Sequence, residues 1–209
     1  MSMSLVVKNM VLGMIMTNCY IAYDDVVKEA FIVDPADSAD EIQLKITELG
    51  VKPVAILLTH GHFDHIGAVD ELRDKYKIKV YVYEDEKDVM TSDANLASMI
   101  GKRMSVEADE YLRDLQTIII GGEKIQVIHT PGHTKGSCCF YLPDEKVLFS
   151  GDTMFCQSFG RTDFPTGSMS QLISSIKNRL LKLDDDVKVY PGHNEETKIG
   201  FERHMYDNY

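Results

Sequence analysis

Short apolar runs alternate with turn residues at the start of the chain, which predicts β-strands separated by turns. The predicted strands are Leu5–Val11, Asn18–Tyr23 and Ala30–Val33. A helix is predicted to begin at Ser38, because Glu41 stands three residues later and the pair can form a capping box. Apolar residues then recur at helical spacing, and Gly50 is expected to end this helix.

The next part of the chain predicts a buried strand and a second helix. Val54–Leu58 is almost wholly apolar, as expected of a strand covered on both faces. Apolar residues from Ile66 to Tyr76 recur at helical spacing, and Lys79–Val82 predicts another strand. The region Glu84–Arg103 has a helical but irregular pattern, and residues 84–115 receive no functional role.

The second half of the chain returns to strands. They are predicted at Thr117–Ile120, Lys124–Ile128, Ser137–Tyr141, Lys146–Phe149 and Val187–Tyr190. A capped helix is predicted from Ser168, with Gln171 at its third position, and a short helix after Glu195. Two comparable halves of this kind predict an α/β fold with two face-to-face sheets and outer helices, a four-layer αββα sandwich. A single doubly wound sheet is the alternative that the same pattern allows.

Composition narrows the classes of partner. The chain has 209 residues, 44% of them apolar, which is the size and composition of one globular domain spanning residues 1–209. No apolar run is long enough for a bilayer and no secretory signal is visible, so a cytoplasmic protein without a membrane partner is expected. A net charge of −11 argues against nucleic acid as a partner. No sequence pattern predicts an oligomeric state.

The four cysteines do not predict a zinc finger or a disulfide framework, because none of them forms a Cys-x-x-Cys pair. They are Cys19, Cys138, Cys139 and Cys156. We expect buried thiols, with the adjacent pair Cys138 and Cys139 on opposite faces of a strand. Cys156 is expected near the site described next, but not as a metal ligand.

Four segments share one construction: an apolar strand, a turn residue and then a side chain that can bind metal. Glycine and proline let the backbone turn sharply at a strand end, where a rigid sheet can hold exposed functional groups. The residues of this kind are His60, His62, Asp64, His65, His133, Asp152 and His193. Imidazole and carboxylate groups suit zinc, iron or manganese. The pattern therefore predicts one metal-binding cavity at one edge of the sheets.

The first of these segments carries most of the prediction. A lone histidine is more often a packing or surface residue than a ligand, but three histidines and an aspartate within six residues after a buried strand are not explained in that way. The other ligand positions depend on the shared construction. His129 precedes a Pro-Gly turn and is expected to be structural or to orient a ligand, and His204 is expected at the surface.

Several motifs resemble those of the metallo-β-lactamase superfamily. Thr59–His65 is similar to its signature, and His129–Ser137 and Phe149–Thr153 are similar to its second and third motifs. Gly160–Pro165, Tyr190–His193 and Asn18–Tyr20 resemble the glyoxalase II branch, the hydroxyacylglutathione hydrolases and their compact bacterial relatives. The resemblance covers almost the whole chain, which ends sixteen residues after His193. A C-terminal helical domain like that of full-length glyoxalase II is therefore not expected.

The resemblance implies a dinuclear site. One divalent ion would be held by His60, His62 and His133, and the other by Asp64, His65 and His193, with Asp152 as the bridge. Zinc is the expected metal, with iron and manganese as alternatives. Asp64 and Asp152 would also be catalytic, because they would hold the metals and orient the attacking oxygen.

The expected function is metal-dependent hydrolysis of a small-molecule thioester, such as S-D-lactoylglutathione or a related acyl-thiol. Arg161 is a candidate ligand for a substrate carboxylate, although a salt bridge to Asp163 is an equal alternative. Phe63, Phe155 and Phe159 are candidates for the walls of the pocket. Two other functions remain compatible with the motifs. They are a persulfide dioxygenase with a single iron, which shares the loop at Gly160–Phe164, and a lactonase.

Overall fold

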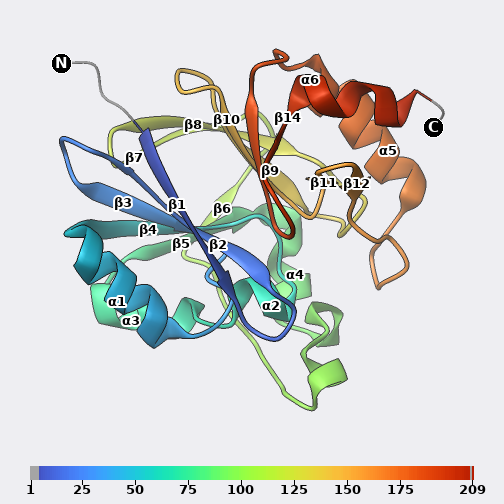
Figure 1. Ribbon diagram of the computed structural model, residues 1–209. Helices are drawn as coiled ribbons and strands as arrows, with labels where there is room; N and C mark the ends of the chain where they lie inside the picture. Colours follow the sequence, from blue (N-terminus) through green and yellow to red (C-terminus); the bar gives the residue numbers. More distant parts are fainter. Residues whose placement is uncertain (1–4, 208) are drawn as a thin grey trace.

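Two six-stranded sheets form the centre of the computed structural model, which describes residues 5–207 and residue 209 (Figure 1). The first sheet has the order β1 (Leu5–Leu12), β2 (Thr17–Asp24), β3 (Glu29–Val33), β4 (Lys52–Leu58), β5 (Lys79–Tyr83) and β6 (Glu110–Leu112). The second has the order β14 (Thr197–Lys198), β13 (Lys188–Pro191), β10 (Val147–Gly151), β9 (Cys138–Leu142), β8 (Glu123–His129) and β7 (Thr117–Ile120). A small hairpin pairs β11 (Met154–Phe155) with β12 (Ser158–Phe159).

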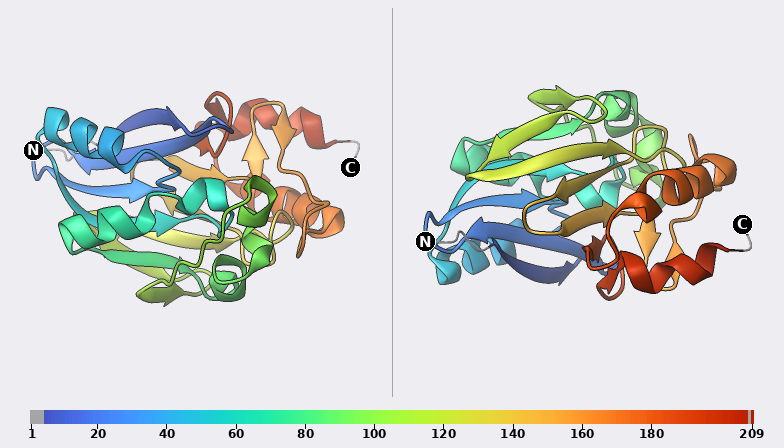
Figure 2. Two further views of the ribbon diagram at one scale, coloured as in Figure 1. Left: turned by 90° about the horizontal axis from the view of Figure 1, so that it is seen from below. Right: turned by 90° about the horizontal axis from the view of Figure 1, so that it is seen from above.

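Three hydrophobic clusters separate four layers. The central cluster lies between the sheets, where Phe31 of β3 packs near Phe149 of β10 with ring centroids 6.0 Å apart. A second cluster joins the outer face of the first sheet to helices α1 (Ala39–Leu49) and α3 (Val69–Tyr76). A third joins the second sheet to α5 (Met169–Asn178) and α6 (Ile199–Glu202). In Figure 1 the strands lie between α1 and α3 at the lower left and α5 and α6 at the upper right, and Figure 2 shows α5 and α6 (orange and red) at the opposite end of the molecule from α1 (light blue). The predicted αββα sandwich is confirmed, and a single sheet is excluded.

The adjacent cysteines show how one strand serves two layers. Side chains alternate across a strand, so Cys138 packs in the central cluster while Cys139 packs in the outer one. Cys19 is also buried, whereas Cys156 is half-buried. The predicted burial is therefore confirmed for three of the four thiols.

The predicted helix starts needed correction. Neither Ser38 nor Ser168 makes a side-chain capping hydrogen bond, so both capping boxes are wrong. Ser38 has a left-handed backbone (φ 52°), and the hydroxyl of Ser168 lies near that of Ser170 instead. The pattern predicted as one helix from Ile66 to Tyr76 is divided into α2 (Phe63–Ile66) and α3, because the amide of Gly67 donates to the carbonyl of Ala36.

The irregular region after β5 consists of several short helices. They are a 3-10 turn at Glu84–Glu86, α4 (Lys87–Met90), and 3-10 turns at Asp93–Asn95 and Ala97–Ile100. Further 3-10 turns lie at Leu180–Lys182 and Arg203–Tyr206. Throughout residues 5–207, no helix combines the length and the apolar character that crossing a membrane requires.

Strand direction brings the predicted ligand segments to one edge. Strands β3, β4, β5 and β6 are parallel, so their carboxyl ends share that edge. In the second sheet β10 is parallel to β13, and β8 runs in the same direction because both β8 and β10 are antiparallel to β9. The amide of Cys138 donates to the carbonyl of Thr59 over 2.9 Å and connects the two sheets there. The loops after β4, β8, β10 and β13 therefore meet.

Candidate metal centre

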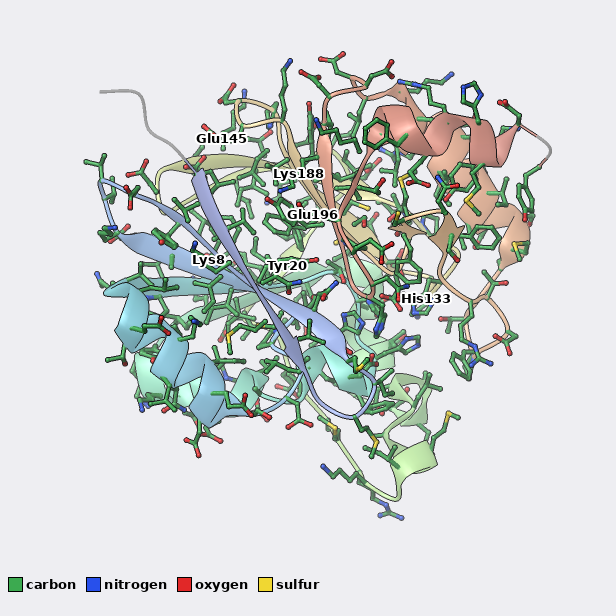
Figure 3. The ribbon with its side chains drawn as sticks, viewed as in Figure 1. Lys8, Tyr20, His133, Glu145, Lys188 and Glu196 are labelled. Atoms are coloured by element: carbon green, nitrogen blue, oxygen red, sulfur yellow. The ribbon has the colours of Figure 1, made fainter. Side chains whose placement is uncertain are left out.

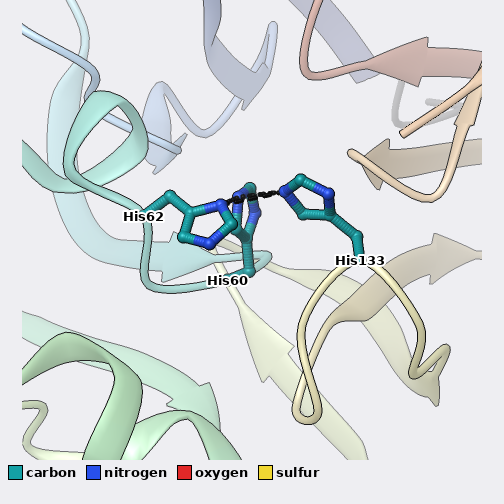
Figure 4. Close-up of side chains that lie close together, drawn as sticks. All are labelled: His60, His62 and His133. Atoms are coloured by element: carbon teal, nitrogen blue, oxygen red, sulfur yellow. Dashed lines mark hydrogen bonds between the residues drawn. The ribbon is translucent and has the colours of Figure 1, made fainter. Parts of the chain in front are cut away.

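Three histidines from two loops point their ring nitrogens at one another. His60 and His62 follow β4, and His133 follows β8. The Nε2 atom of His133 lies 3.2 Å from Nε2 of His60 and 2.9 Å from Nδ1 of His62, and these last two atoms are 3.1 Å apart (Figure 4). A zinc–nitrogen bond is about 2.0–2.1 Å, so three nitrogens with this spacing can all contact one ion.

A second group contains two histidines and two aspartates. His65 Nε2 lies 3.5 Å from Asp64 Oδ2, and His193 Nε2 lies 3.4 Å from the same oxygen. Asp152 stands between the groups, with Oδ1 3.4 Å from His65 Nε2 and Oδ2 3.4 Å from His133 Nε2. The structure therefore brings all seven predicted ligand residues together, and a carboxylate in the position of Asp152 can contact two ions.

Unpartnered buried atoms show that these residues fit a metal. In residues 5–207, neither His65 Nε2 nor Asp152 Oδ1 has a hydrogen-bond partner, although both are buried. Such atoms are costly unless a cation or water satisfies them. Gly192 leaves the necessary space, because a Cβ atom there would lie 2.2 Å from Asp152 Oδ1 and 2.8 Å from His65 Cε1. An alanine at this position would displace both side chains.

Two of the rings are oriented by acceptors on their far side. His133 Nδ1 lies 2.7 Å from the carbonyl oxygen of Arg161, and His65 Nδ1 lies 2.9 Å from Asp34 Oδ2. Both acceptors require an N–H at Nδ1, so Nε2 is the nitrogen of each ring that would bind metal in its unprotonated form. Asp34 also accepts from the amide and the hydroxyl of Thr59, next to His60.

Sequence reasoning missed Asp34, although a signal was present. Asp34 comes directly after the buried strand β3 and precedes a proline, which resembles the construction at the predicted ligands except that the turn residue follows the carboxylate. Its role is different, because it contacts the far side of His65 rather than the cavity.

Glu86 is a second positioning residue that the sequence concealed. Its fully buried carboxylate accepts from the amides of Gly61 over 2.8 Å and Gly136 over 2.9 Å, and from the hydroxyl of Thr134. Gly61 stands between His60 and His62, and Thr134 follows His133. Glu86 thus joins the two loops of the three-histidine group. In the sequence it stands in an acidic run, where a solvated surface is the common expectation.

The start of β2 supports the other group. The hydroxyl of Thr17 donates to Asp64 Oδ2 over 2.9 Å. The side-chain amide of the buried Asn18 donates to the carbonyls of Pro191 and Asn194, both over 2.9 Å, and the Tyr20 hydroxyl also donates to Pro191. These bonds hold both sides of the loop that carries His193.

Burial and charge divide the histidines into two kinds. Burial lowers the pKa values of His60 and His62 well below the usual range and also lowers that of His133. These rings are therefore neutral and ready to bind metal at neutral pH. Burial opposes protonation of His65 too, but the carboxylates of Asp64, Asp152 and Asp34 outweigh it and raise its pKa to about 10. The group of two histidines and two aspartates therefore favours a positive charge, as expected of a site that binds a cation.

A cavity of about 510 Å³ opens beside the candidate ligands. The predicted wall residues Phe63, Phe155 and Phe159 line it, and so does Arg161. The Arg161 guanidinium makes a two-point ion pair with Asp163, which was the alternative considered for it.

The remaining histidines and Cys156 lie outside the described ligand groups. His129 stacks on Tyr83 with ring centroids 4.1 Å apart, and its Nε2 contacts the carbonyl of Lys135, in keeping with a structural role. The side chain of His204 is 94% exposed, as predicted.

Comparisons with known proteins agree with this geometry. The family model of the metallo-beta-lactamase superfamily matches residues 12–193. A Haemophilus influenzae protein named hydroxyacylglutathione hydrolase GloC is 34% identical over 197 residues, which cover 89% of each chain. The crystal structure of BLEG-1 B3 metallo-beta-lactamase is 41% identical, with a TM-score of 0.90 and coverage of 95% of this chain and 97% of the other. The di-iron-bound form of TTHA1623 is 31% identical, with a TM-score of 0.85 and coverage of 95% and 98%.

Proposed function

The chain belongs to the metallo-β-lactamase superfamily, and from this premise we propose that it is a dinuclear metal-dependent hydrolase of thioesters. The observation that carries the proposal is the position of Asp152, between three histidines on one side and the Asp64–His65–His193 group on the other. One divalent ion would bind His60, His62 and His133. The other would bind Asp64, His65 and His193, and Asp152 would contact both.

Two bound ions would supply Lewis acidity and lower the pKa of water towards about 7. The protein supplies position and charge. Asp152 and Asp64 orient the attacking water oxygen, and the Thr17 hydroxyl keeps Asp64 in place. The water oxygen forms a bond to the acyl carbon and the carbon–sulfur bond breaks. The products are a carboxylate, a thiol and one proton. A thiol is a good leaving group, with a pKa of about 8.5, so no separate strong acid is required.

Support for thioesters comes from the relative named hydroxyacylglutathione hydrolase, which matches nine-tenths of this chain. Support for the metals comes from the donor set, since imidazole and carboxylate suit zinc, iron and manganese. We propose two zinc ions, with iron as the alternative because a 31% identical protein has been crystallised in a di-iron form. Elemental analysis of the purified protein decides between them.

The decisive experiment is thiol release from S-D-lactoylglutathione by metal-loaded protein, with a chelated sample as the control. We expect release that chelation abolishes and metal restores. His133→Ala should remove a ligand and abolish release while the protein remains folded, as judged by circular dichroism. A fully active His133→Ala protein, or release that chelation leaves unchanged, would refute the proposed centre.

Hydrolysis of a β-lactam is the second candidate, because a structure named as a B3 metallo-beta-lactamase is 41% identical over nearly the whole chain. The same metal-loaded sample should therefore be assayed with a chromogenic cephalosporin. Turnover of the cephalosporin without any thioester cleavage would replace the first proposal by the second.

A further inference from the structure

The walls of the larger cavity are mostly apolar. Apart from the five candidate ligands, nine residues line this cavity, and eight of them are apolar. They come from four separate parts of the chain, one of which is Phe63 at the start of α2. Ile15 stands between β1 and β2, and Leu96, Met99 and Ile100 belong to the short helices after β5. Phe155 and Phe159 are on the β11–β12 hairpin. Several distant segments thus place hydrocarbon beside the metal centre.

The one charged residue among these nine, Arg161, is already neutralised. Its Nε and one terminal nitrogen donate to the two oxygens of Asp163 over 2.8 and 2.6 Å. The same guanidinium lies 3.9 Å from the ring centroid of Phe164, another lining residue. Binding a substrate carboxylate at Arg161 would compete with this two-point ion pair.

The adjoining smaller cavity does not supply a positive site either. It shares Ile15, Phe63, Asp64 and Ile100 with the larger one, so the two are adjacent. Apart from Asp64, its charged lining residues are Lys102 and Asp37, whose formal charges sum to zero. A glutathione thioester carries two carboxylates, and the described lining offers no matched pair of free cations for them.

On the basis of the proposed thioester hydrolysis, we propose that the larger cavity binds the acyl group and that the preferred substrates carry an apolar acyl chain or ring. The acyl group, rather than a charged thiol carrier, is assigned to this cavity because the lining is largely apolar and its arginine, Arg161, is already paired with Asp163. A volume of about 510 Å³ is within the range of small-molecule pockets, which are about 300–1,000 Å³. Met99 and Ile15 are 66% and 46% exposed, so an acyl chain would cover apolar surface that now faces water.

The test is a series of thioesters of one thiol, N-acetylcysteamine, with acetyl, butanoyl, hexanoyl and benzoyl groups. The kcat/KM of each is measured with the metal-loaded full chain. Burial of one methylene contributes about fourfold to an equilibrium constant, so we expect the hexanoyl ester to exceed the acetyl ester by at least about tenfold. The acyl chain stays partly exposed in an open cavity, so the hexanoyl-to-acetyl ratio of kcat/KM should lie below the product of about fourfold for each added methylene.

Two methionine variants locate the effect. Met99→Ser should lower the hexanoyl-to-acetyl ratio of kcat/KM by about threefold or more, because Met99 lines the cavity. Met169→Ser is the matched control, since Met169 is 46% exposed at the start of α5 and lines neither cavity. This control should keep the wild-type ratio, and both variants should keep the wild-type metal content.

Each other outcome overturns the inference in a distinguishable way. Chelator-sensitive cleavage at equal rates for acetyl and hexanoyl esters would reject the acyl cavity and leave thioester hydrolysis standing. Cleavage of S-D-lactoylglutathione far faster than every apolar thioester would also reject the acyl cavity and leave thioester hydrolysis standing. Failure to cleave any thioester would reject the proposed function together with the inference.

Discussion

Replacing Glu86 by glutamine tests whether one buried carboxylate keeps the three-histidine group in place. Its two oxygens accept from Gly61 on one ligand loop and from Thr134 and Gly136 on the other. Burial raises the pKa of Glu86 to about 7, and the three donors oppose that shift. Glutamine has the same shape but only one accepting oxygen. Its NH₂ group must therefore face an N–H of one loop, and that loop should move.

The size of the effect follows from the bonds that are lost. A buried donor left without a partner costs about 1–3 kcal/mol. Loss of a residue that orients metal ligands typically weakens metal binding by about 10–100-fold, which corresponds to about 1.4–2.7 kcal/mol. The two ranges agree, so we expect Glu86→Gln to raise the zinc dissociation constant of the His60–His62–His133 group by about 10–100-fold.

The assay is competition for zinc between the protein and a chromophoric chelator, with the visible spectrum of cobalt-substituted protein as a second readout. Glu84→Gln is the control, because the side chain of this nearby glutamate is 45% exposed and lies 3.5 Å from Arg113 at the surface. Thr134→Val, which removes one donor to Glu86, should show a smaller weakening. If folded Glu86→Gln protein binds zinc within twofold of the wild type, the positioning role is refuted.

Two further predictions concern other parts of the molecule. Asn18→Leu removes the hydrogen bonds to Pro191 and Asn194, so the His193 loop should loosen and the metal content should fall from two ions to one; two retained ions would contradict this. Burial, together with the negative charges of Glu145, Asp24 and Asp144, raises the pKa of Glu123 to about 7. This acidic group is remote from the metal centre, since Figure 3 shows Glu145 well apart from His133. Because the folded chain then holds this proton more tightly than the unfolded chain, the stability due to Glu123 falls as the pH rises from about 4.5 to about 7 and stays low above it. Glu123→Gln should therefore raise the melting temperature more at pH 8 than at pH 5, and equal shifts at both values would show that Glu123 does not titrate in this way.

The sequence of neighbouring residues was sufficient to predict much of the candidate site. His60, His62, Asp64 and His65 lie within six residues after the buried strand β4, so their proximity depends on one turn. Apolar runs identified most of the long strands, because a strand covered on both faces must be apolar nearly throughout. The short strands β6, β11, β12 and β14 were missed, since two or three residues carry too little pattern.

Features that depend on distant contacts were decided only by the tertiary structure. The pairing of the strands shows that the chain forms two sheets rather than one, whereas the apolar pattern along the chain is the same for both architectures. Asp34 contacts a histidine 31 residues away, and Glu86 reaches Gly136, 50 residues away. The apolar cavity collects side chains from Ile15 to Phe164. Propensity and periodicity act over a few residues, whereas hydrogen bonds and packing across the sheets join segments that only the folded chain brings together.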